Sequence, residues 1–74
     1  MNVERIGLKI RIKRKMLGMS QQQLAKKLGY SSRSTINKIE MGINSIPLKM
    51  LDKYAAALNC SVSDLLGIKS EKGS

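Results

Sequence analysis

Apolar residues recur along this chain at intervals of three and four, the spacing that places them on one side of an α-helix. The pattern divides into five segments, separated by glycine, serine, asparagine and proline residues of the kind that start or end helices. These segments cover residues 3–17, 21–28, 33–41, 47–58 and 62–66. We therefore expect an all-α fold.

Two short helices joined by a tight turn form the centre of the sequence. Ser20 and Gln23 make a capping-box pattern at the start of the first helix, and Gly29 supplies a left-handed stop at its end. Either Ser31 or Ser32 caps the second helix. The inward-facing residues of the pair are Leu24, Ala25, Leu28, Ile36 and Ile39. In a basic chain, helix, short turn and helix is the helix-turn-helix pattern.

The first predicted helix has two apolar sides. Its core side consists of Val3, Ile6, Ile10 and Leu17, with the aliphatic stem of Lys13 at the edge. A second stripe, nearly opposite, consists of Leu8, Ile12 and Met16. A helix that is apolar on two sides is covered twice or meets a partner. We expect the fifth helix or the C-terminal segment to cover the second stripe, and the alternative is a surface that contacts another protein.

The last two helices are marked by the residues at their ends. We expect Ser45 to cap the fourth helix, Pro47 to occupy its first turn and Asn59 to end it. Ser61 and Asp64 repeat the capping box at the start of the fifth helix. The inner side of the fourth helix consists of Leu48, Leu51, Ala55 and Leu58, with Tyr54 at its edge.

Length and charge narrow the class of protein. A chain of 74 residues with 42% hydrophobic residues suits one small domain with a core of modest size. The net charge of +9 comes from 14 basic against 5 acidic residues, and it favours a polyanionic partner through counterion release at phosphates. The alternative is a merely solvated basic surface. A membrane surface is disfavoured because no helix pairs a basic side with bulky aromatic residues.

The residue groupings typical of a catalytic or metal site do not occur in this sequence. The chain has no histidine, and its one cysteine, Cys60, fits a small buried apolar group in a reducing compartment. No carboxylate cluster, metal-ligand spacing or GxxxxGK loop occurs. We expect no enzyme activity, no cofactor and no small-molecule ligand. With no signal peptide and no apolar run of about 18 residues, the protein is expected to be soluble and intracellular.

The ordered set of residues resembles the Cro/repressor-type (XRE-like) DNA-binding domain of phages and bacteria. The resemblance is carried by Ser20-Gln21, Leu24-Ala25, Leu28-Gly29, Ser34-Thr35-Ile36, Ile39-Glu40, Gly42, Leu51, Tyr54-Ala55, Leu58 and the run from Val62 to Gly67. It covers roughly residues 5–67. We therefore assign residues 1–67 to a helix-turn-helix domain and residues 68–74 to a polar tail or the start of a linker.

The turn between the central helices departs from the family pattern. Between the positions of Gly29 and Ile36 this chain looks one residue longer than most members of the family. Deleting Tyr30 would restore the usual length. We expect a domain shortened in this way to fold, with the second helix shifted in register and the preferred operator changed.

The resemblance implies a compact five-helix lambda-repressor-like fold and a transcriptional regulator, usually a repressor. It further implies a homodimer on a two-fold operator in double-stranded DNA, in the cytoplasm of a bacterial or phage-infected cell and at its nucleoid. Two other functions remain open. One is a protein-interaction module such as an antitoxin component, which would use the second stripe of the first helix. The other is a nonspecific nucleic-acid binder.

The second central helix is the expected reading element. If Ile36 and Ile39 face the core, the outward residues are Arg33, Ser34, Asn37 and Lys38. In this motif the second helix enters the major groove, where such side chains reach base edges. Arginine and lysine donate to guanine acceptors, and asparagine pairs with adenine. The alternative is an ordinary solvated helix side.

Other positions are expected to grip phosphate or brace the fold. By resemblance, Arg14 pairs with Glu40 and bridges two helices. The phosphate-contacting residues are expected to be Ser20, Gln21, Arg14, Thr35, Asn44 and Ser45. Capping alone also explains Ser20, a turn signal explains Asn44, and Thr35 touches either DNA or the neighbouring helix. Lys13 or Lys15, near the end of the first helix, could also approach phosphates.

Overall fold

The computed structural model describes residues 3–66 of the chain, and every regular element within that range is helical. The elements are α1 (Val3–Met16), α2 (Gln21–Leu28), α3 (Arg33–Glu40), a short 3-10 helix η1 (Leu48–Met50), α4 (Leu51–Ala57) and α5 (Val62–Leu66). The all-α fold expected from the sequence is therefore present, with each of the predicted helices near its predicted place. No helix in the described range is long and apolar enough to cross a membrane.

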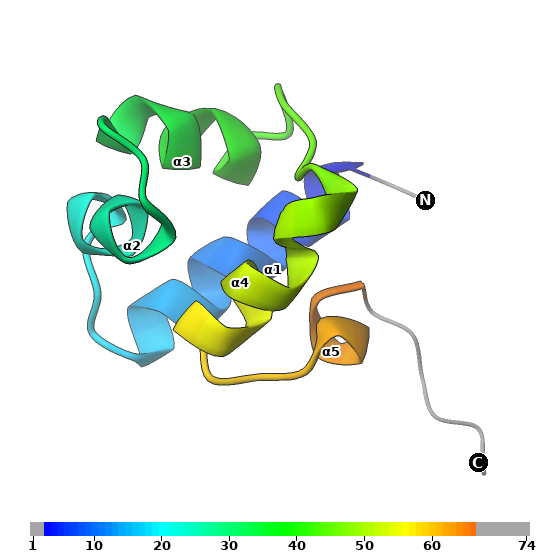
Figure 1. The fold of residues 1–74 in the computed structure, drawn as a ribbon. Coiled ribbons are helices and arrows are strands. Elements are labelled where there is room, and N and C mark those ends of the chain that lie inside the picture. Colours follow the sequence, from blue (N-terminus) through cyan, green and yellow to red (C-terminus); the bar gives the residue numbers. More distant parts are fainter. Residues whose placement is uncertain (1–2, 67–74) are drawn as a thin grey trace, which may run out of the picture.

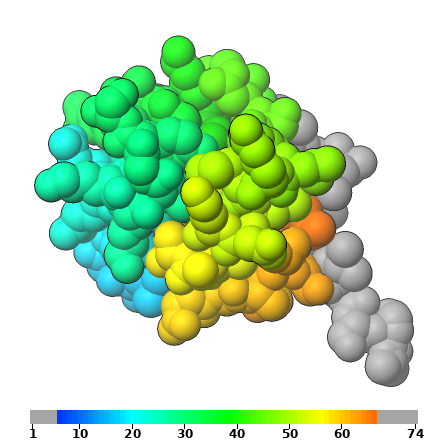
Figure 2. All heavy atoms as spheres, viewed as in Figure 1, coloured from blue at the N-terminus to red at the C-terminus, as the bar shows by residue number. Residues whose placement is uncertain are grey.

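The helices pack around one core. Figure 1 shows α2 and α3 side by side at one end, with α1 running behind α4 and with α5 below them. The core is formed by Ile10, Leu24, Ala25, Leu28, Ile36, Ile39, Tyr54, Ala55, Leu58 and Leu65. All five α-helices contribute to it, which explains how so short a chain encloses a core. In the space-filling view, the side chains of α3, the following loop and α4 form one continuous surface (Figure 2).

The predicted caps fix the ends of α2. The backbone amide of Gln23 donates to Ser20 Oγ at 3.0 Å, and the Ser20 amide donates to Gln23 Oε1 at 2.8 Å. This reciprocal pair satisfies two donors that a helix start leaves unpaired. Gly29 ends α2 with φ of 83°, the left-handed conformation that glycine adopts without strain.

Caps of the same kind position α3 and α5. Ser32, rather than Ser31, caps α3 by accepting from the Ser34 amide at 3.1 Å. The Ser61 and Asp64 capping box also forms, with bonds of 3.1 and 3.2 Å. Before it, Asn59 adopts a positive φ of 57°, as expected for the end of the preceding helix.

The start of the fourth helix differs from the prediction. The backbone at Pro47 is extended, with ψ of 137°, and no side-chain cap such as Ser45 precedes η1. The chain then makes one 3-10 turn before α4 begins. Because this turn is wound differently from an α-helix, Leu48 does not join the inner stripe and is 84% exposed. The placement of Leu48 in the core was wrong.

Two further core assignments need correction. Leu17 was expected on the core side of α1, but the helix ends at Met16 and the chain turns away at Gly18, which has φ of 71°. Leu17 is consequently 45% exposed. Tyr54 was expected at the edge of the core and is instead fully buried.

Tyr54 is held in the core by a second tyrosine. Its hydroxyl lies 3.0 Å from that of Tyr30, and the two rings are tilted with centroids 6.4 Å apart. Tyr30 is half-buried in the α2–α3 turn and packs against the core. Deleting Tyr30 would remove this contact, so Ser31, which is exposed, is the better residue to delete when the turn is shortened.

Gly7 allows α1 and α3 to approach closely. A methyl group built at this glycine would lie 2.2 Å from the carbonyl oxygen of Ile39 and 2.8 Å from that of Glu40. Both neighbours are backbone atoms, which cannot rotate away. The α1–α3 crossing therefore requires a residue without a side chain at this position. The sequence pattern did not identify this role.

The second apolar stripe of α1 is not covered by the fifth helix. Leu8, Ile12 and Met16 are 52, 48 and 79% exposed. Helix α5 packs against α1 but leaves these three side chains free, so the expectation that it would cover them was wrong. The C-terminal segment, the other expected cover, lies outside the described residues.

Cys60 is half-buried against the core, where burial raises the pKa of its thiol.

Candidate nucleic-acid interface

The outward side of α3 carries the polar residues that the sequence singled out. Ile36 and Ile39 are 0 and 3% exposed and fix the rotation of the helix about its axis. The residues that consequently project into solvent are Arg33, Ser34, Asn37 and Lys38. Thr35 is half-buried beside them. The helix thus presents a contiguous set of donors on a rigid, capped element.

The α2–α3 pair as a whole is positively charged. Helices α2 and α3 together contain one acidic residue, Glu40, whose side chain is 3% exposed. Four basic residues on the same helices are exposed, namely Lys26, Lys27, Arg33 and Lys38. No carboxylate of α2 or α3 is therefore free to repel an anion that approaches them.

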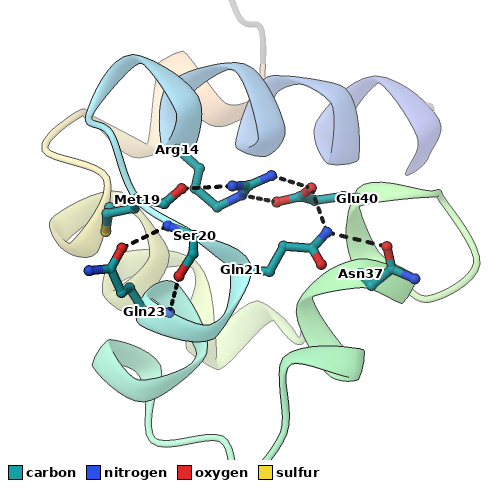
Figure 3. A network of polar contacts seen from close by, with 7 residues as sticks. All are labelled: Arg14, Met19, Ser20, Gln21, Gln23, Asn37 and Glu40. Atoms are coloured by element: carbon teal, nitrogen blue, oxygen red, sulfur yellow. Dashed lines mark hydrogen bonds and ion pairs between the residues drawn. The ribbon is translucent and has the colours of Figure 1, made fainter.

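Arg14 is committed to the interior of the fold. Its Nε donates to Glu40 Oε2 at 2.6 Å, and its Nη2 donates to Glu40 Oε1 at 3.1 Å. Its Nη1 donates to the carbonyl oxygen of Met19 at 2.7 Å, just before α2 (Figure 3). The side chain is 8% exposed, so Arg14 joins α1, the start of α2 and the end of α3. The structure gives no support to its expected role as a phosphate contact.

Gln21 continues the same hydrogen-bond network to the outward side of α3. Its Nε2 donates to Glu40 Oε1 at 3.1 Å and to Asn37 Oδ1 at 3.2 Å (Figure 3). The Asn37 amide nitrogen in turn lies 3.4 Å from the sulfur of Met41. An unbroken series of contacts therefore runs from Arg14 to an outward residue of α3. Sequence reasoning assigned Gln21 to phosphate and missed this link, for which the spacing of the residues gives no signal.

The other expected phosphate contacts lie at the two ends of the helix pair. Ser20 is exposed, and its hydroxyl accepts the capping hydrogen bond from Gln23. After α3, the backbone amides of Ile43 and Asn44 donate to the carbonyl oxygen of Lys38 at 2.9 and 3.3 Å. These bonds fold the loop back onto the end of α3 and leave Asn44 and Ser45 exposed.

A shallow polar recess lies between α1 and the helix pair. It has a volume of about 400 Å³, and its lining residues are Arg11, Arg14, Lys15, Gln21, Asn37, Glu40 and Met41. The exposed members from α1 are Arg11 and Lys15. Lys13 is not part of the recess. It lies near Asp64 in α5: hydrogen bonds with Ser61 lower the pKa of the Asp64 carboxyl, and the positive charge of Lys13 lowers it further. Of the two lysines considered at the end of α1, Lys15 is therefore the one that lies in the recess beside α3.

The described residues do not gather as a metal site would require. Within residues 3–66, no group of three or more histidine, cysteine, aspartate or glutamate side chains could hold a metal ion. The polar groups near α3 are amides, hydroxyls and cations, which bind anions and base edges.

Comparison with known proteins agrees with this geometry. A family model described as Helix-turn-helix matches residues 10–65. The chain belongs to the helix-turn-helix family of transcriptional regulators. The match spans all of α2, α3 and α4, the second half of α1 and most of α5, so the resemblance identified from the sequence is confirmed across the core.

Two curated relatives are similar over most of this chain. An uncharacterized HTH-type transcriptional regulator of Sinorhizobium medicae is 40% identical over 58 residues, which are 78% of this chain and 41% of the relative. A competence pilus inhibition repressor of Acinetobacter baylyi is 40% identical over 60 residues, 81% of this chain and 54% of the relative. The chain thus spans about half the length of these relatives or less.

A solved structure is similar along nearly its whole length. The restriction-modification controller protein C.AhdI of Aeromonas hydrophila superimposes with a TM-score of 0.78 at 30% sequence identity. The superposition covers 85% of this chain and 94% of C.AhdI. The arrangement of helices in this chain is therefore shared with nearly all of C.AhdI.

Proposed function

We propose that this protein is a transcriptional repressor that reads a two-fold DNA operator with α3 in the major groove. The observation that carries the proposal is the outward side of α3, where Arg33, Ser34, Asn37 and Lys38 project from a helix fixed by buried isoleucines. Membership of a family of regulators and similarity to a named repressor support the biological role. Such a protein would act in the cytoplasm of a bacterial or phage-infected cell, at the nucleoid.

The base-reading residues differ in what they can recognise. Arg33 and Lys38 are exposed cations that would donate to the O6 and N7 acceptors of guanine. Asn37 is already oriented, because its Oδ1 accepts from Gln21. Its amide nitrogen, with only a weak sulfur acceptor at 3.4 Å, would serve as the donor to a base. Ser34 would contribute a shorter contact at the start of the helix.

Phosphate contacts would flank the reading helix on both sides. We assign Arg11 and Lys15 to one strand, because they line the recess beside Gln21 and Asn37. Ser20 and Gln21 would add the positive end of α2, with contacts that are weaker because the side chains also bond internally. On the other side, we keep Asn44 and Ser45 in the exposed loop as phosphate contacts. Thr35, half-buried, would make at most an edge contact.

Two copies would meet at an apolar hollow close to this loop. The hollow has a volume of about 150 Å³ and is lined by Ile6, Ile39, Asn44, Ser45, Ile46, Leu48, Leu51 and Leu66. Leu48 is 84% exposed at its edge, an unusual position for a large apolar side chain unless another surface covers it. A two-fold contact here would place the two α3 helices on half-sites about 34 Å apart, one helical turn of DNA.

Selection of bound sequences from a random DNA pool tests the proposal. We expect enrichment of an inverted repeat whose half-site centres lie about one helical turn apart. Binding to the selected operator should exceed binding to unrelated DNA by at least about 10³-fold at physiological salt. Equal binding to all sequences would reject operator reading and leave a nonspecific nucleic-acid binder.

The dimer contact needs a separate measurement. Leu48→Gln should weaken cooperative binding to the full operator while leaving binding to an isolated half-site unchanged. Met16→Gln, at a comparably exposed apolar residue that does not line the hollow, is the matched control and should change neither. Loss of half-site binding in Leu48→Gln would show instead that the variant disturbs the fold.

A further inference from the structure

A second interaction surface lies on the outer side of α1. Leu8, Ile12 and Met16 recur every fourth residue and form a stripe about 12 Å long, two turns of helix. They are 52, 48 and 79% exposed, so each keeps about half or more of its surface in solvent. The core residue Ile10 and the buried Arg14 point to the opposite side of the same helix. The stripe is therefore not an edge of the core but a separate apolar surface.

Cations border the stripe along both sides. Arg11 and Lys15 are exposed on the side that faces the recess beside α3. On the side that faces α5, Lys9 and Lys13 are half-buried, and their positive charges help to lower the pKa of Asp64. A partner that covers the stripe must therefore be apolar along its middle and acidic along its edges.

We propose that the α1 stripe binds an acidic amphipathic helix of another protein, with leucine-like side chains facing Ile12 and carboxylates facing the bordering cations. A helix laid along α1 matches the length and the repeat of the stripe. A second copy of this chain matches poorly, since two α1 helices packed on this side would bring their basic edges together. The occupant is thus distinguished from a self-contact by charge.

The partner would compete with DNA, an effect that rests on the proposed function. Arg11 and Lys15 border the stripe and also line the recess where a phosphate would lie. An acidic helix that engages them removes cations from the DNA contact, and DNA in turn weakens binding of the helix by the same factor. The surface would then act as a site at which an acidic protein releases the regulator from its operator.

A pair of synthetic peptides provides the first test. One is an end-blocked helix with leucines at every fourth position flanked by glutamates, and the other has the same leucines flanked by lysines. We expect measurable binding of the acidic peptide by fluorescence anisotropy, weakening as salt rises, and at least roughly tenfold weaker binding of the basic peptide. Equal binding of both peptides, or no binding of the acidic one, would overturn the proposal.

Variants locate the site. Ile12→Gln should weaken the acidic peptide at least roughly tenfold, since central apolar contacts dominate such interfaces. Ile43→Gln, at an exposed apolar residue of the loop after α3, is the control and should bind it normally. Because Ile12 is outside the core, Ile12→Gln should keep its helical circular dichroism and melting temperature. Peptide binding that survives in Ile12→Gln would place the contact elsewhere and overturn the assignment.

Two further readouts separate the other occupants. If sedimentation shows a dimer of the unmodified protein and a monomer of Ile12→Gln, the stripe binds a second copy of this chain and the proposed partner helix is rejected. Vesicles of anionic phospholipid that bind through Ile12, without peptide binding, would replace it by a membrane. Operator titration with and without the acidic peptide then tests the competition. Failure of that step alone rejects the link to DNA and leaves the peptide site standing.

Discussion

Arg14 and Glu40 form a two-point ion pair between α1 and α3, with Nε to Oε2 at 2.6 Å and Nη2 to Oε1 at 3.1 Å. The two side chains are 8 and 3% exposed, so both charges are largely withdrawn from water. The same carboxylate accepts from Gln21, which also bonds Asn37. The position of α3 therefore depends on a buried ion pair as well as on its apolar contacts with the core.

Removing one partner of this pair should be costly. Arg14→Ala leaves the Glu40 carboxylate buried and uncompensated, and we expect a loss of about 3 kcal/mol in the free energy of unfolding. Urea denaturation of Arg14→Ala, Glu40→Ala and the double variant measures the coupling between the two residues. Arg11→Ala, an exposed arginine of the same helix, is the control and should change stability by less than about 0.5 kcal/mol. Additive effects of the two single variants would show that the pair contributes no coupling.

Gly7→Ala should be destabilising although alanine is the better helix former. The exchange normally gains about 1 kcal/mol inside a helix. Here the added methyl group would lie 2.2 Å from the Ile39 carbonyl oxygen, so α1 and α3 must separate, at an expected net loss of about 2 kcal/mol. Gly18→Ala provides a comparison. A methyl group at Gly18 would meet no neighbouring atom, so the only expected cost is the backbone strain of alanine at a φ of 71°. A melting temperature raised by Gly7→Ala would contradict the close α1–α3 contact.

Tyr54 should make the fold sensitive to alkaline pH. Burial, followed by the hydrogen bond with Tyr30, raises the pKa of Tyr54 far above its ordinary value of 10.0. In the unfolded chain Tyr54 ionises near pH 10, whereas in the folded chain it stays protonated, so stability is full below pH 10 and falls as the pH rises further. Urea denaturation between pH 8 and about 11 measures this decline. Tyr54→Phe should lose part of the alkaline decline, while Tyr30→Phe, which keeps Tyr54 buried, should retain most of it.

Lys38 should determine sequence preference and Gln21 should not. Lys38→Ala is expected to relax preference at one base-pair position in each half-site and to cost about 1–3 kcal/mol on the best operator. Gln21→Ala should weaken operator and random DNA by similar factors, with an added loss of preference only where Asn37 reads, because Gln21 orients that residue. Titrations against the operator, its single-base variants and random DNA distinguish the two. A uniform weakening by Lys38→Ala would remove that residue from the reading set.

Lys15 and Lys13 should differ in their effect on salt dependence. Lys15 lines the recess beside α3, whereas Lys13 lies on the side of α1 that faces Asp64 of α5. Lys15→Gln should therefore reduce the slope of log affinity against log salt by about one, while Lys13→Gln should leave it nearly unchanged. The two variants carry the same change in net charge, so any difference reports position. Equal slopes would mean that neither lysine has a preferred phosphate.

The sequence by itself determined the local structure of this protein. The capping boxes at Ser20 and Ser61, the left-handed ends at Gly29 and Asn59 and the apolar spacing depend on contacts within four residues or so, and such contacts are encoded where they occur. The rotation of α3 followed as well, because two buried isoleucines at helical spacing leave the opposite side of the helix in solvent. The family resemblance supplied the pairing of Arg14 with Glu40, which spacing alone does not give.

Only the tertiary structure decided which distant residues meet. Gly7 lies opposite Ile39, Tyr30 contacts Tyr54, and Gln21 donates hydrogen bonds to both Glu40 and Asn37. The two residues of each contact are more than 15 positions apart in sequence. It also withdrew Arg14 from the surface, turned Leu48 outward and left the second stripe of α1 open. These outcomes depend on how helices cross and how turns are wound, which composition and periodicity do not specify.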